Sequence, residues 1–457
     1  MNTRVIGIDL AVTAVHKAVV LDVAENKFVS HVLNFENNPA SIARILDIAR
    51  KDAPKDLRLV VIMEATGMSW FVVGQYFKRH GAEVYRINGQ QVGGLRKVYN
   101  RYAKSDKIDT RVIARLYLIH PERLHRLDIP SGEHLALQRA CRERARLVKL
   151  STANKNRLVA TDKFAWLNLS KVLPPYGERA FWVRSYWYNP WKVAKIGPEA
   201  LTLAWQETFH HQDTETAWII DLCKQAQCVV DLYESPALDY ELLQEDVHRE
   251  QLRFQKAQTQ IVNLQRDVIS PIYRKLHPQQ YLETLQGVGQ ESAAIYVAFI
   301  GNISRFPTVR QFLGWSGLVP YSRQSGYAEA KGLHVTQAGP NLVKATAYLN
   351  ANVARLYDPQ IAKIYYDQMV NKGKHHNQAI CACATHLLRR IYAVLRDNRP
   401  YQLQDTDGNL LSKREARQIC IKHFRVPEEV RTRNNQRIRK AKYEEKTETQ
   451  YQKRHKA

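Results

Sequence analysis

Short hydrophobic runs separated by polar turns dominate the first part of the chain. Residues 4–10 and 17–22 are apolar and rich in β-branched side chains, which is typical of paired strands, and 27–35 could supply a third strand. A further run at 57–63 is bounded by polar residues, as in a buried strand, and 82–87 predicts another.

Between and after these runs, apolar residues recur at helical spacing. The pattern predicts helices over 41–50, 69–80 and 106–119. The resulting order is three strands, helix, strand, helix, strand, helix, which is the order of a ribonuclease-H-like α/β domain. We therefore expect such a domain over 1–125, although other α/β folds can show a similar order.

The remainder of the chain predicts mainly helices. Residues 133–160 and 239–277 read as long charged helices, the second with imperfect heptad spacing, and they predict a coiled-coil arm over 126–280. The two could pair with each other or with another subunit. A helical domain is expected over 281–400. The basic tail, 401–457, is expected to be partly disordered and to touch nucleic acid, with a solvated helical surface as the alternative.

A change in composition at 162–236 interrupts this helical region. Six of the eight tryptophans lie there, and Pro174, Pro175, Pro190 and Pro198 prevent one long helix. We interpret the stretch as an inserted module whose aromatic side chains form a small core. Stacking of these rings on unpaired bases is the less favoured alternative.

Composition places the chain among globular proteins. Of its 457 residues, 45% are hydrophobic and 25% charged, which excludes long-range disorder. No apolar run approaches the roughly 18 residues that a membrane span needs, and no signal-peptide pattern opens the chain. Six scattered cysteines do not form a disulfide framework. We therefore expect a cytoplasmic protein without a membrane partner.

The net charge of +24 indicates that the chain binds a polyanionic partner. Nucleic acid is favoured, because neutralising its phosphates releases condensed counterions and gives strong, salt-dependent binding. A membrane surface is less favoured, since no strongly amphipathic basic helix stands out.

Four acidic residues occupy positions suited to binding metal. Asp9 ends the first predicted strand, Glu64 ends a later one, and Asp106 and Asp109 lie on one face at the start of a helix. Taken singly, each could be a turn cap, a salt-bridge partner or a helix N-cap. Together they predict an oxygen-rich site for Mg²⁺ or Mn²⁺, which supports phosphoryl transfer.

Two further features suggest contacts with nucleic acid. Gly287, Val288 and Gly289 lie between apolar stretches and predict a helix-hairpin-helix that contacts the phosphate backbone, with an ordinary helix–helix turn as the alternative. In the tail, five basic residues are candidate contacts: Arg431, Arg433, Arg437, Arg439 and Lys440.

A serine in a polar loop is a candidate nucleophile. Ser325 precedes a glycine, and Arg323 is close by to stabilise charge on a phosphate under attack. On composition alone, Ser316 and Ser322 are equally plausible.

These motifs, taken in order, resemble those of the DEDD insertion-sequence transposases, relatives of the Piv DNA invertase. The acidic motifs are Gly7-Ile-Asp9, Glu64-Ala-Thr-Gly67 and Lys104-Ser-Asp106-Lys-Ile-Asp109. The C-terminal motifs are Leu285-Gln-Gly-Val-Gly289, Gln311-Phe312, Gly317-Leu-Val-Pro320, Arg323-Gln-Ser325-Gly326 and Gln337-Ala-Gly339. The resemblance covers about 1–160 and 239–396; the insert and the tail depart from the family pattern.

The resemblance implies a RuvC-like domain in which Asp9, Glu64, Asp106 and Asp109 bind Mg²⁺. It also implies that Ser325, in a helical domain, attacks DNA and forms a phosphoserine intermediate. The implied partners are donor and target DNA, a structured guide RNA (a bridge RNA), and further copies of the chain in dimers or tetramers with shared active sites.

Two other functions remain open from the sequence. One is a metal-dependent DNA junction nuclease that uses water, with Ser325 merely structural. The other is a non-enzymatic architectural nucleic-acid-binding protein. A zinc site is not expected, because His375, His376 and the cysteines lack its spacing, and Cys381 and Cys383 are expected to pack on a helix.

Overall fold

The computed structural model of the chain contains two compact units, Met1–Pro130 and Ser131–Ala457. It describes residues 2–54, 56–64, 67–87, 92–95, 105–167, 169–174, 176–209, 216–236, 238–321, 324–325, 328–329, 333–336, 338–437 and 440. Within these ranges, no helix is both long enough and apolar enough to cross a membrane.

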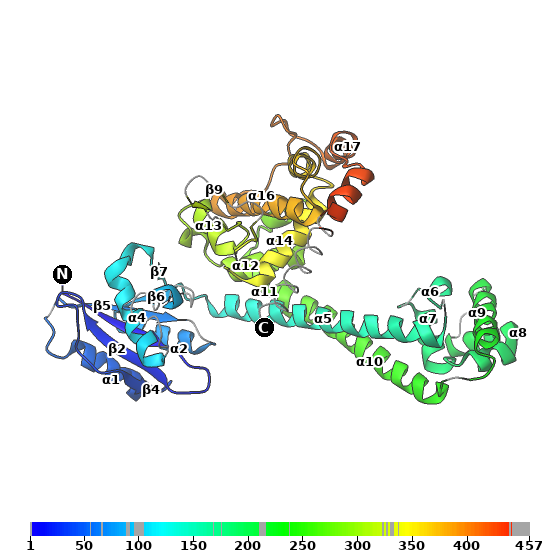
Figure 1. The fold of residues 1–457 in the computed structure, drawn as a ribbon, viewed down its shortest axis with the longest axis horizontal. Helices are drawn as coiled ribbons and strands as arrows, with labels where there is room; N and C mark the ends of the chain where they lie inside the picture. The colour runs from blue at the N-terminus through cyan, green and yellow to red at the C-terminus, as the bar shows by residue number, and fades with distance from the viewer. Residues whose placement is uncertain are drawn as a thin grey trace, which may run out of the picture. The chain divides into compact units, whose positions relative to one another are not determined.

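A mixed sheet forms the centre of the first unit (Figure 1). Its strands are β1 (Thr3–Asp9), β2 (His16–Asp22), β3 (Lys27–Phe28), β4 (Leu33–Phe35), β5 (Arg58–Glu64), β6 (Glu83–Ile87) and β7 (His125–Arg126). The order across the sheet is β3-β2-β1-β5-β6-β7, with β4 also paired to β2. β1 is antiparallel to β2 and parallel to β5, which is parallel to β6. This topology is compatible with the expected ribonuclease-H-like fold.

Helices cover both faces of this sheet, because its central strands are apolar on both sides. α1 (Pro39–Arg50) and α2 (Ser69–Arg79) bury Ile45 and Phe77 against one face, which includes Ile6 and Ile8 of β1. α4 (Asp106–Ile119) packs Val112 and its neighbours on the other face. The short helix η1 (Pro121–Arg123) leads from α4 to β7.

Gly7 marks the point where α4 crosses β1. A Cβ atom at this position would lie 2.6 Å from the backbone nitrogen of Ala114 and 2.7 Å from the carbonyl oxygen of Thr110. No side chain fits into that space, because real Cβ atoms do not approach backbone atoms so closely. The glycine therefore lets the helix lie directly on the strand that carries Asp9.

We expect Gly7→Ala to lower the free energy of unfolding by about 2 kcal/mol or more, the cost of forcing extra volume into a packed interface. Differential scanning calorimetry of the full chain measures this change. Gly94→Ala is the control, since a Cβ there meets no heavy atom within 4 Å. Equal effects of the two substitutions would show that α4 does not depend on the close approach.

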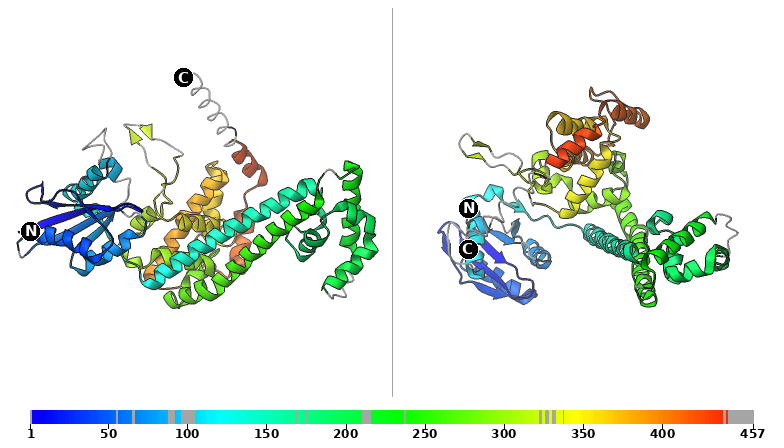
Figure 2. Two further views of the ribbon diagram at one scale, coloured as in Figure 1. Left: turned by 90° about the horizontal axis from the view of Figure 1, so that it is seen from below. Right: turned by 45° about the vertical axis from the view of Figure 1, so that its right-hand side comes forward.

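Two long helices form the arm of the second unit. α5 (Gly132–Ala165) lies beside α10 (Tyr240–Leu264), which continues through a π-helical turn, η2 (Gln265–Ile269), into α11 (Ser270–Leu276) (Figures 1 and 2). The side-chain amide of Gln258 donates to the hydroxyl of Ser151 between them at 2.7 Å. Of the two pairings expected from the sequence, the structure shows the one within the chain.

The tryptophan-rich stretch forms a helical module at the far end of the arm, made of α6 (Leu169–Val172), α7 (Glu178–Tyr186), α8 (Pro190–Phe209) and α9 (Ala217–Tyr233). Trp166, Trp182, Trp205 and Trp218 are buried in its core, which confirms the prediction of a small core. Beside them, a buried ion pair joins Arg184 to Asp162 of α5.

The rest of the second unit is a helical domain around one large apolar cluster. Its helices are η3 (Tyr281–Thr284), α12 (Gln290–Ile300), η4 (Ile303–Arg305), α13 (Val309–Ser316), α14 (Asn341–Ala354), α15 (Pro359–Tyr366), η5 (Asp367–Asn371), α16 (His376–Asp397) and α17 (Lys413–His423). A two-stranded hairpin, β8 (Gln324–Ser325) with β9 (Ala328–Glu329), interrupts them.

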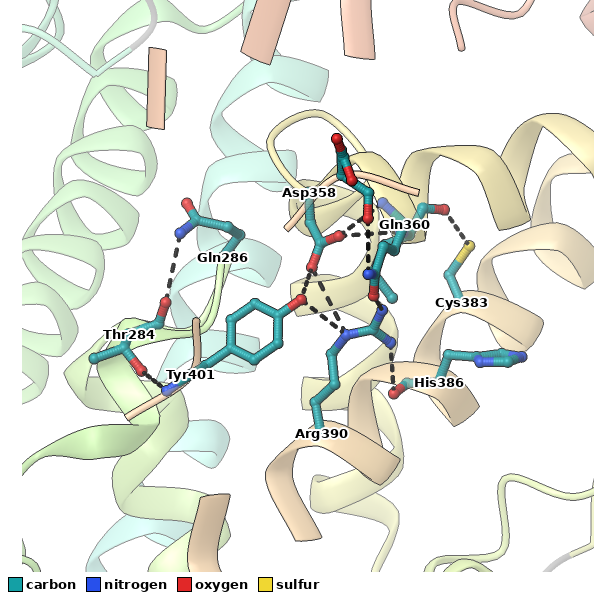
Figure 3. Close-up of polar contacts among 10 residues, drawn as sticks. Thr284, Gln286, Asp358, Gln360, Cys383, His386, Arg390 and Tyr401 are labelled. Atoms are coloured by element: carbon teal, nitrogen blue, oxygen red, sulfur yellow. Dashed lines mark hydrogen bonds and ion pairs between the residues drawn. The ribbon is translucent and has the colours of Figure 1, made fainter. Parts of the chain in front are cut away.

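The beginning of the basic tail, 401–437, is folded as part of this domain. The hydroxyl of Tyr401 donates to the carboxylate of Asp358 at 2.9 Å and accepts from Arg390, which also donates to Gln360 (Figure 3). Asp358 is buried and caps α15. α17 follows, and the chain is helical again over 428–437.

Candidate active site

The parallel pairing of β1 with β5 places Asp9 and Glu64 next to each other. Ile8 pairs with Met63, so both strands deliver their next residue, a carboxylate, at the same edge of the sheet. Side chains alternate between the faces of a strand, so Asp9 lies on the same face as Val5, and Glu64 on the same face as Val60. This is the face that α4 covers.

The first turn of α4 supplies the other two acids. The hydroxyl of Ser105 accepts a hydrogen bond from the backbone of Ile108 and so caps the helix, which begins at Asp106. Asp106 and Asp109 lie in this turn, where the positive end of the helix dipole favours carboxylates.

All four acids interact electrostatically. Burial, followed by the charges of Asp106, Glu64 and Asp109, raises the pKa of Asp9 from 3.8 to about 6. Only Lys17 among the contributing groups acts in the opposite direction. Asp9 therefore lies near enough to the other three predicted acids for their charges to act on it.

Lys17 is the cation of this site, and the sequence analysis did not predict it. Its ammonium group forms an ion pair with the carboxylate of Asp106. It could have been predicted from the β1–β2 hairpin, because Lys17 is directly opposite Asp9 in the antiparallel register.

The donor set suits a divalent cation in its chemistry. Four carboxylates provide only oxygen ligands, which hard ions such as Mg²⁺ prefer. The pKa of Asp9 is raised first by burial and then by the charges of the other acids, which a cation would neutralise. Within the described part of the chain, no three His, Cys, Asp or Glu side chains are close enough to hold one ion. A metal bound here would need the carboxylates to move closer together.

The raised pKa of Asp9 predicts a pH-dependent stability. A carboxyl whose pKa is higher in the folded than in the unfolded chain stabilises the fold most below pH 4, and this contribution is lost as the pH rises to about 6. Without metal, Asp9→Asn should therefore raise the melting temperature at pH 8 and change it little at pH 4. Asp47→Asn, at an exposed position of α1, is the control. A pH-independent difference would contradict the assignment.

Ser325 is the last residue of β8, in the hairpin that interrupts the helical domain. Its backbone pairs with Ala328, and the two residues between them fall outside the described ranges. Nearer the helices, the hairpin is held by hydrogen bonds from Tyr321 to His334 and from Thr336 to Val319. The predicted nucleophile is thus in an extension built on regular backbone pairing.

Two glycines of the quoted motifs form the base of this hairpin. A Cβ at Gly317 would clash with the carbonyl oxygen of Ala338, and one at Gly339 would clash with that of Trp315. Both glycines have positive φ values, 74° and 69°. The two ends of the hairpin can therefore cross only because neither residue has a side chain.

The alternative serines differ in their surroundings. Ser316 is fully buried, and its hydroxyl donates to the carbonyl of Leu313 and accepts from Leu318, so it has a structural role in this structure. Ser322 and the predicted charge-stabilising Arg323 lie outside the described residues.

The turn at 287–289 packs against a helix. Gly287 has φ +81°, and a Cβ there would clash with the carbonyl oxygen of Asn350 in α14. Val288 is buried, and Glu291 in the first turn of α12 forms an ion pair with Arg144 of α5. These features give Gly287 and Val288 a packing role, while Gly289 is exposed at the start of α12. The helix before the turn is only a 3₁₀ turn, so the predicted helix-hairpin-helix is incomplete.

The predicted basic contacts in the tail lie in different surroundings. Arg433 and Lys440 are exposed, and Arg431 is partly buried. The guanidinium group of Arg437 donates to the carbonyl of Gly373 at 2.6 Å. Arg439 lies outside the described residues. Their contact with nucleic acid stays a prediction.

Comparison with known proteins identifies the family. A model of DEDD transposases of the IS110 type matches residues 6–161, and a model of the IS116/IS110/IS902 transposase family matches 279–366. The chain belongs to this family of DEDD insertion-sequence transposases. The matched regions contain the four acids and Ser325, and they leave out the tryptophan-rich module and the chain after 366.

Similar proteins point in the same direction. The 43.6 kDa protein of insertion element IS110 from Streptomyces coelicolor is 31% identical over 28% of this chain and 31% of its own length. The pilin gene-inverting protein of Moraxella bovis is 27% identical over 27% of the chain and 39% of its own length. The chain thus spans less than two fifths of these relatives. The 44.8 kDa protein of insertion element IS116 from Streptomyces clavuligerus is 25% identical over 86% of the chain and 95% of its own length.

Proposed function

We propose that the chain is a DNA recombinase that cuts and rejoins strands during transposition, with Ser325 as nucleophile and a divalent metal bound by the four acids. The observation that supports this proposal is that Asp9 and Glu64 end neighbouring parallel strands, and that the charges of Asp106 and Asp109, from the first turn of α4, also act on Asp9. Membership of a DEDD transposase family and the net charge of +24 support DNA as the substrate.

In this proposal the acids hold the metal and position the phosphate. Asp9, Glu64, Asp106 and Asp109 are the ligands, and Lys17 releases Asp106 when the ion enters. The bound Mg²⁺ or Mn²⁺ would lower the pKa of a coordinated hydroxyl and neutralise charge on the phosphate. With the charge of the carboxylates neutralised by a metal, the ammonium group of Lys17 would be free to donate to a phosphate oxygen.

The serine makes the cut reversible. The hydroxyl oxygen of Ser325 bonds to phosphorus and loses its proton, while the bond from phosphorus to the leaving DNA oxygen breaks and that oxygen gains a proton. One phosphate ester replaces another, so a second DNA hydroxyl can displace the serine without an external energy source. Since the acids and Ser325 belong to different units, the reaction requires both units, from one chain or from two, to meet at one phosphodiester.

Metal binding can be tested apart from catalysis. We expect saturating Mg²⁺ to raise the melting temperature of the wild-type chain, because a ligand that binds the folded state stabilises it. The rise should disappear in Asp9→Asn and Glu64→Gln and persist in the control Asp47→Asn. A rise of equal size in all variants would place the metal elsewhere.

Covalent catalysis predicts a protein–DNA adduct. Incubation with Mg²⁺ and DNA carrying the element ends should give an adduct on a denaturing gel, and Ser325→Ala should abolish it because no hydroxyl remains to attack. Ser304→Ala, at an exposed position of the same domain, should leave it unchanged.

The same gel separates the alternatives. Hydrolysed ends that form without an adduct would indicate a metal-dependent nuclease using water. Binding without any cleavage would indicate an architectural protein.

We also propose that a structured RNA guides the chain to its DNA and that it acts as a dimer or tetramer. The support is the resemblance in sequence together with a positive charge that suits more than one nucleic acid. Purification with the natural flanking DNA, followed by sequencing of bound RNA and light scattering, tests both points. One discrete RNA from a flank supports guidance, whereas heterogeneous RNA or none contradicts it.

A further inference from the structure

The last described helical segment, 428–437, is fastened to the helical domain by its asparagines. The side chain of Asn434 is buried and donates to the carbonyls of Met369 and Lys374, at 2.7 and 3.2 Å. The side chain of Asn435 accepts from the backbone nitrogen of His376 at 3.3 Å. This attachment holds the segment against η5 and the start of α16.

The attachment brings Arg431 close to two other basic side chains. Arg355, at the end of α14, lies over the ring of Tyr365 with its guanidinium carbon 4.5 Å from the ring centre. The hydroxyl of Tyr365 is 2.7 Å from Nδ1 of His376. Asn435, which bonds to His376, lies one helical turn after Arg431, so Arg431 is on the same side of the segment. Its charge acts on Arg355, Tyr365 and His376, so basic groups from three segments lie near the start of α16.

Among the described residues, the charged groups that act on His376 are all basic. Burial, then the charges of Arg431, Arg355 and His375, lower the pKa of His376 to about 4. Within the same described part of the chain, the guanidinium group of Arg431 forms no hydrogen bond or ion pair, and that of Arg355 uses only its Nε, which donates to Asn352. Each guanidinium therefore keeps unused donors in a partly buried, positive environment.

The adjacent helix adds to the positive potential. α16 has 22 residues and begins at His376. Its first turn has no acidic residue, and Asn435 is the neutral side chain that accepts from its first backbone nitrogen. The positive end of the helix dipole therefore lies beside the same basic groups. The first turns of α12 and α17 instead carry an acid, Glu291 and Glu415.

We propose that Arg355 and Arg431 bind a backbone phosphate of nucleic acid between the end of α14 and the start of α16. Paired guanidinium forks match the oxygen geometry of a phosphate, and a phosphodiester supplies the negative charge that this place lacks. The site lies partly outside the two matched family regions. This proposal adds a specific phosphate contact to the proposed function. It rests on that function only in taking nucleic acid as the ligand.

Arg431→Gln tests the site, and Arg425→Gln is its matched control. The two substitutions remove the same charge from positions six residues apart, but Arg425 is exposed and is not among the groups acting on His376. Fluorescence anisotropy of the full chain, without metal, measures binding of a labelled DNA duplex and a labelled RNA hairpin at several salt concentrations. We expect Arg431→Gln to weaken binding about tenfold and to reduce the salt slope by about one, and Arg425→Gln to have a clearly smaller effect.

Thermal unfolding without nucleic acid separates a binding role from a structural one. Removing one of two neighbouring positive charges should leave the melting temperature of Arg431→Gln unchanged or higher, and Arg431→Lys should recover part of the affinity. A lower melting temperature in Arg431→Gln than in Arg425→Gln, or equal losses of affinity in both, would overturn the proposal.

The two nucleic acids identify the source of the phosphate. A loss with DNA alone assigns the site to DNA, a loss with RNA alone assigns it to RNA, and a loss with both indicates a shared backbone contact. A loss with neither overturns the proposal. Because the measurement needs no metal and no cleavage, failure of the proposed serine chemistry would leave this result unaffected.

Discussion

The parallel pairing of β1 with β5 is the constraint on which the acidic site depends. Asp9 and Glu64 are 55 positions apart in the chain, and only this register delivers them together, on the face beneath α4. Because side chains alternate along a strand, a slip by one residue would turn Glu64 toward α1 and α2 and bury a charge in their apolar core. The apolar runs that precede both acids prevent such a slip. The core of the first unit therefore fixes the geometry of its chemistry.

Glycines decide how closely the surrounding segments approach. Gly7 lets α4 lie on β1, and Gly317 and Gly339 let the ends of the serine hairpin cross. In the sequence these residues stand beside candidate functional groups and could be taken for part of the chemistry. In the structure their role is steric, because each faces a backbone atom where no Cβ fits. In the first acidic motif, Gly7 makes room for α4 two positions before Asp9, the proposed metal ligand.

Sequence patterns predicted those features of the structure that depend on residues close together in the chain. Apolar runs predicted the strands of the first unit, and helical spacing predicted α4. Asp9 and Glu64 stood out because each ends an apolar run, and Asp106 and Asp109 because they lie on one face of a helix. Lys17 could have been found from the hairpin register opposite Asp9. Arg355 could not, because its relation to Arg431 depends on a fold that brings together residues 76 positions apart. The docking of the tail was missed for the same reason, because Tyr401 and the buried Asn434 bond to residues that are far away in the sequence.

The paired helices of the arm also set a fixed length. At about 1.5 Å per residue, the 34 residues of α5 extend for roughly 50 Å, which is comparable to about 15 base pairs of a DNA duplex. Since α10 returns alongside α5, any change in arm length has to occur in both helices at once. Steps of about seven residues preserve the facing rows of side chains, whereas other steps rotate the tryptophan-rich module about the arm axis. The length of the arm and the orientation of the module are therefore coupled. A longer or shorter arm keeps the module facing the same way only if its length changes in steps of about seven residues.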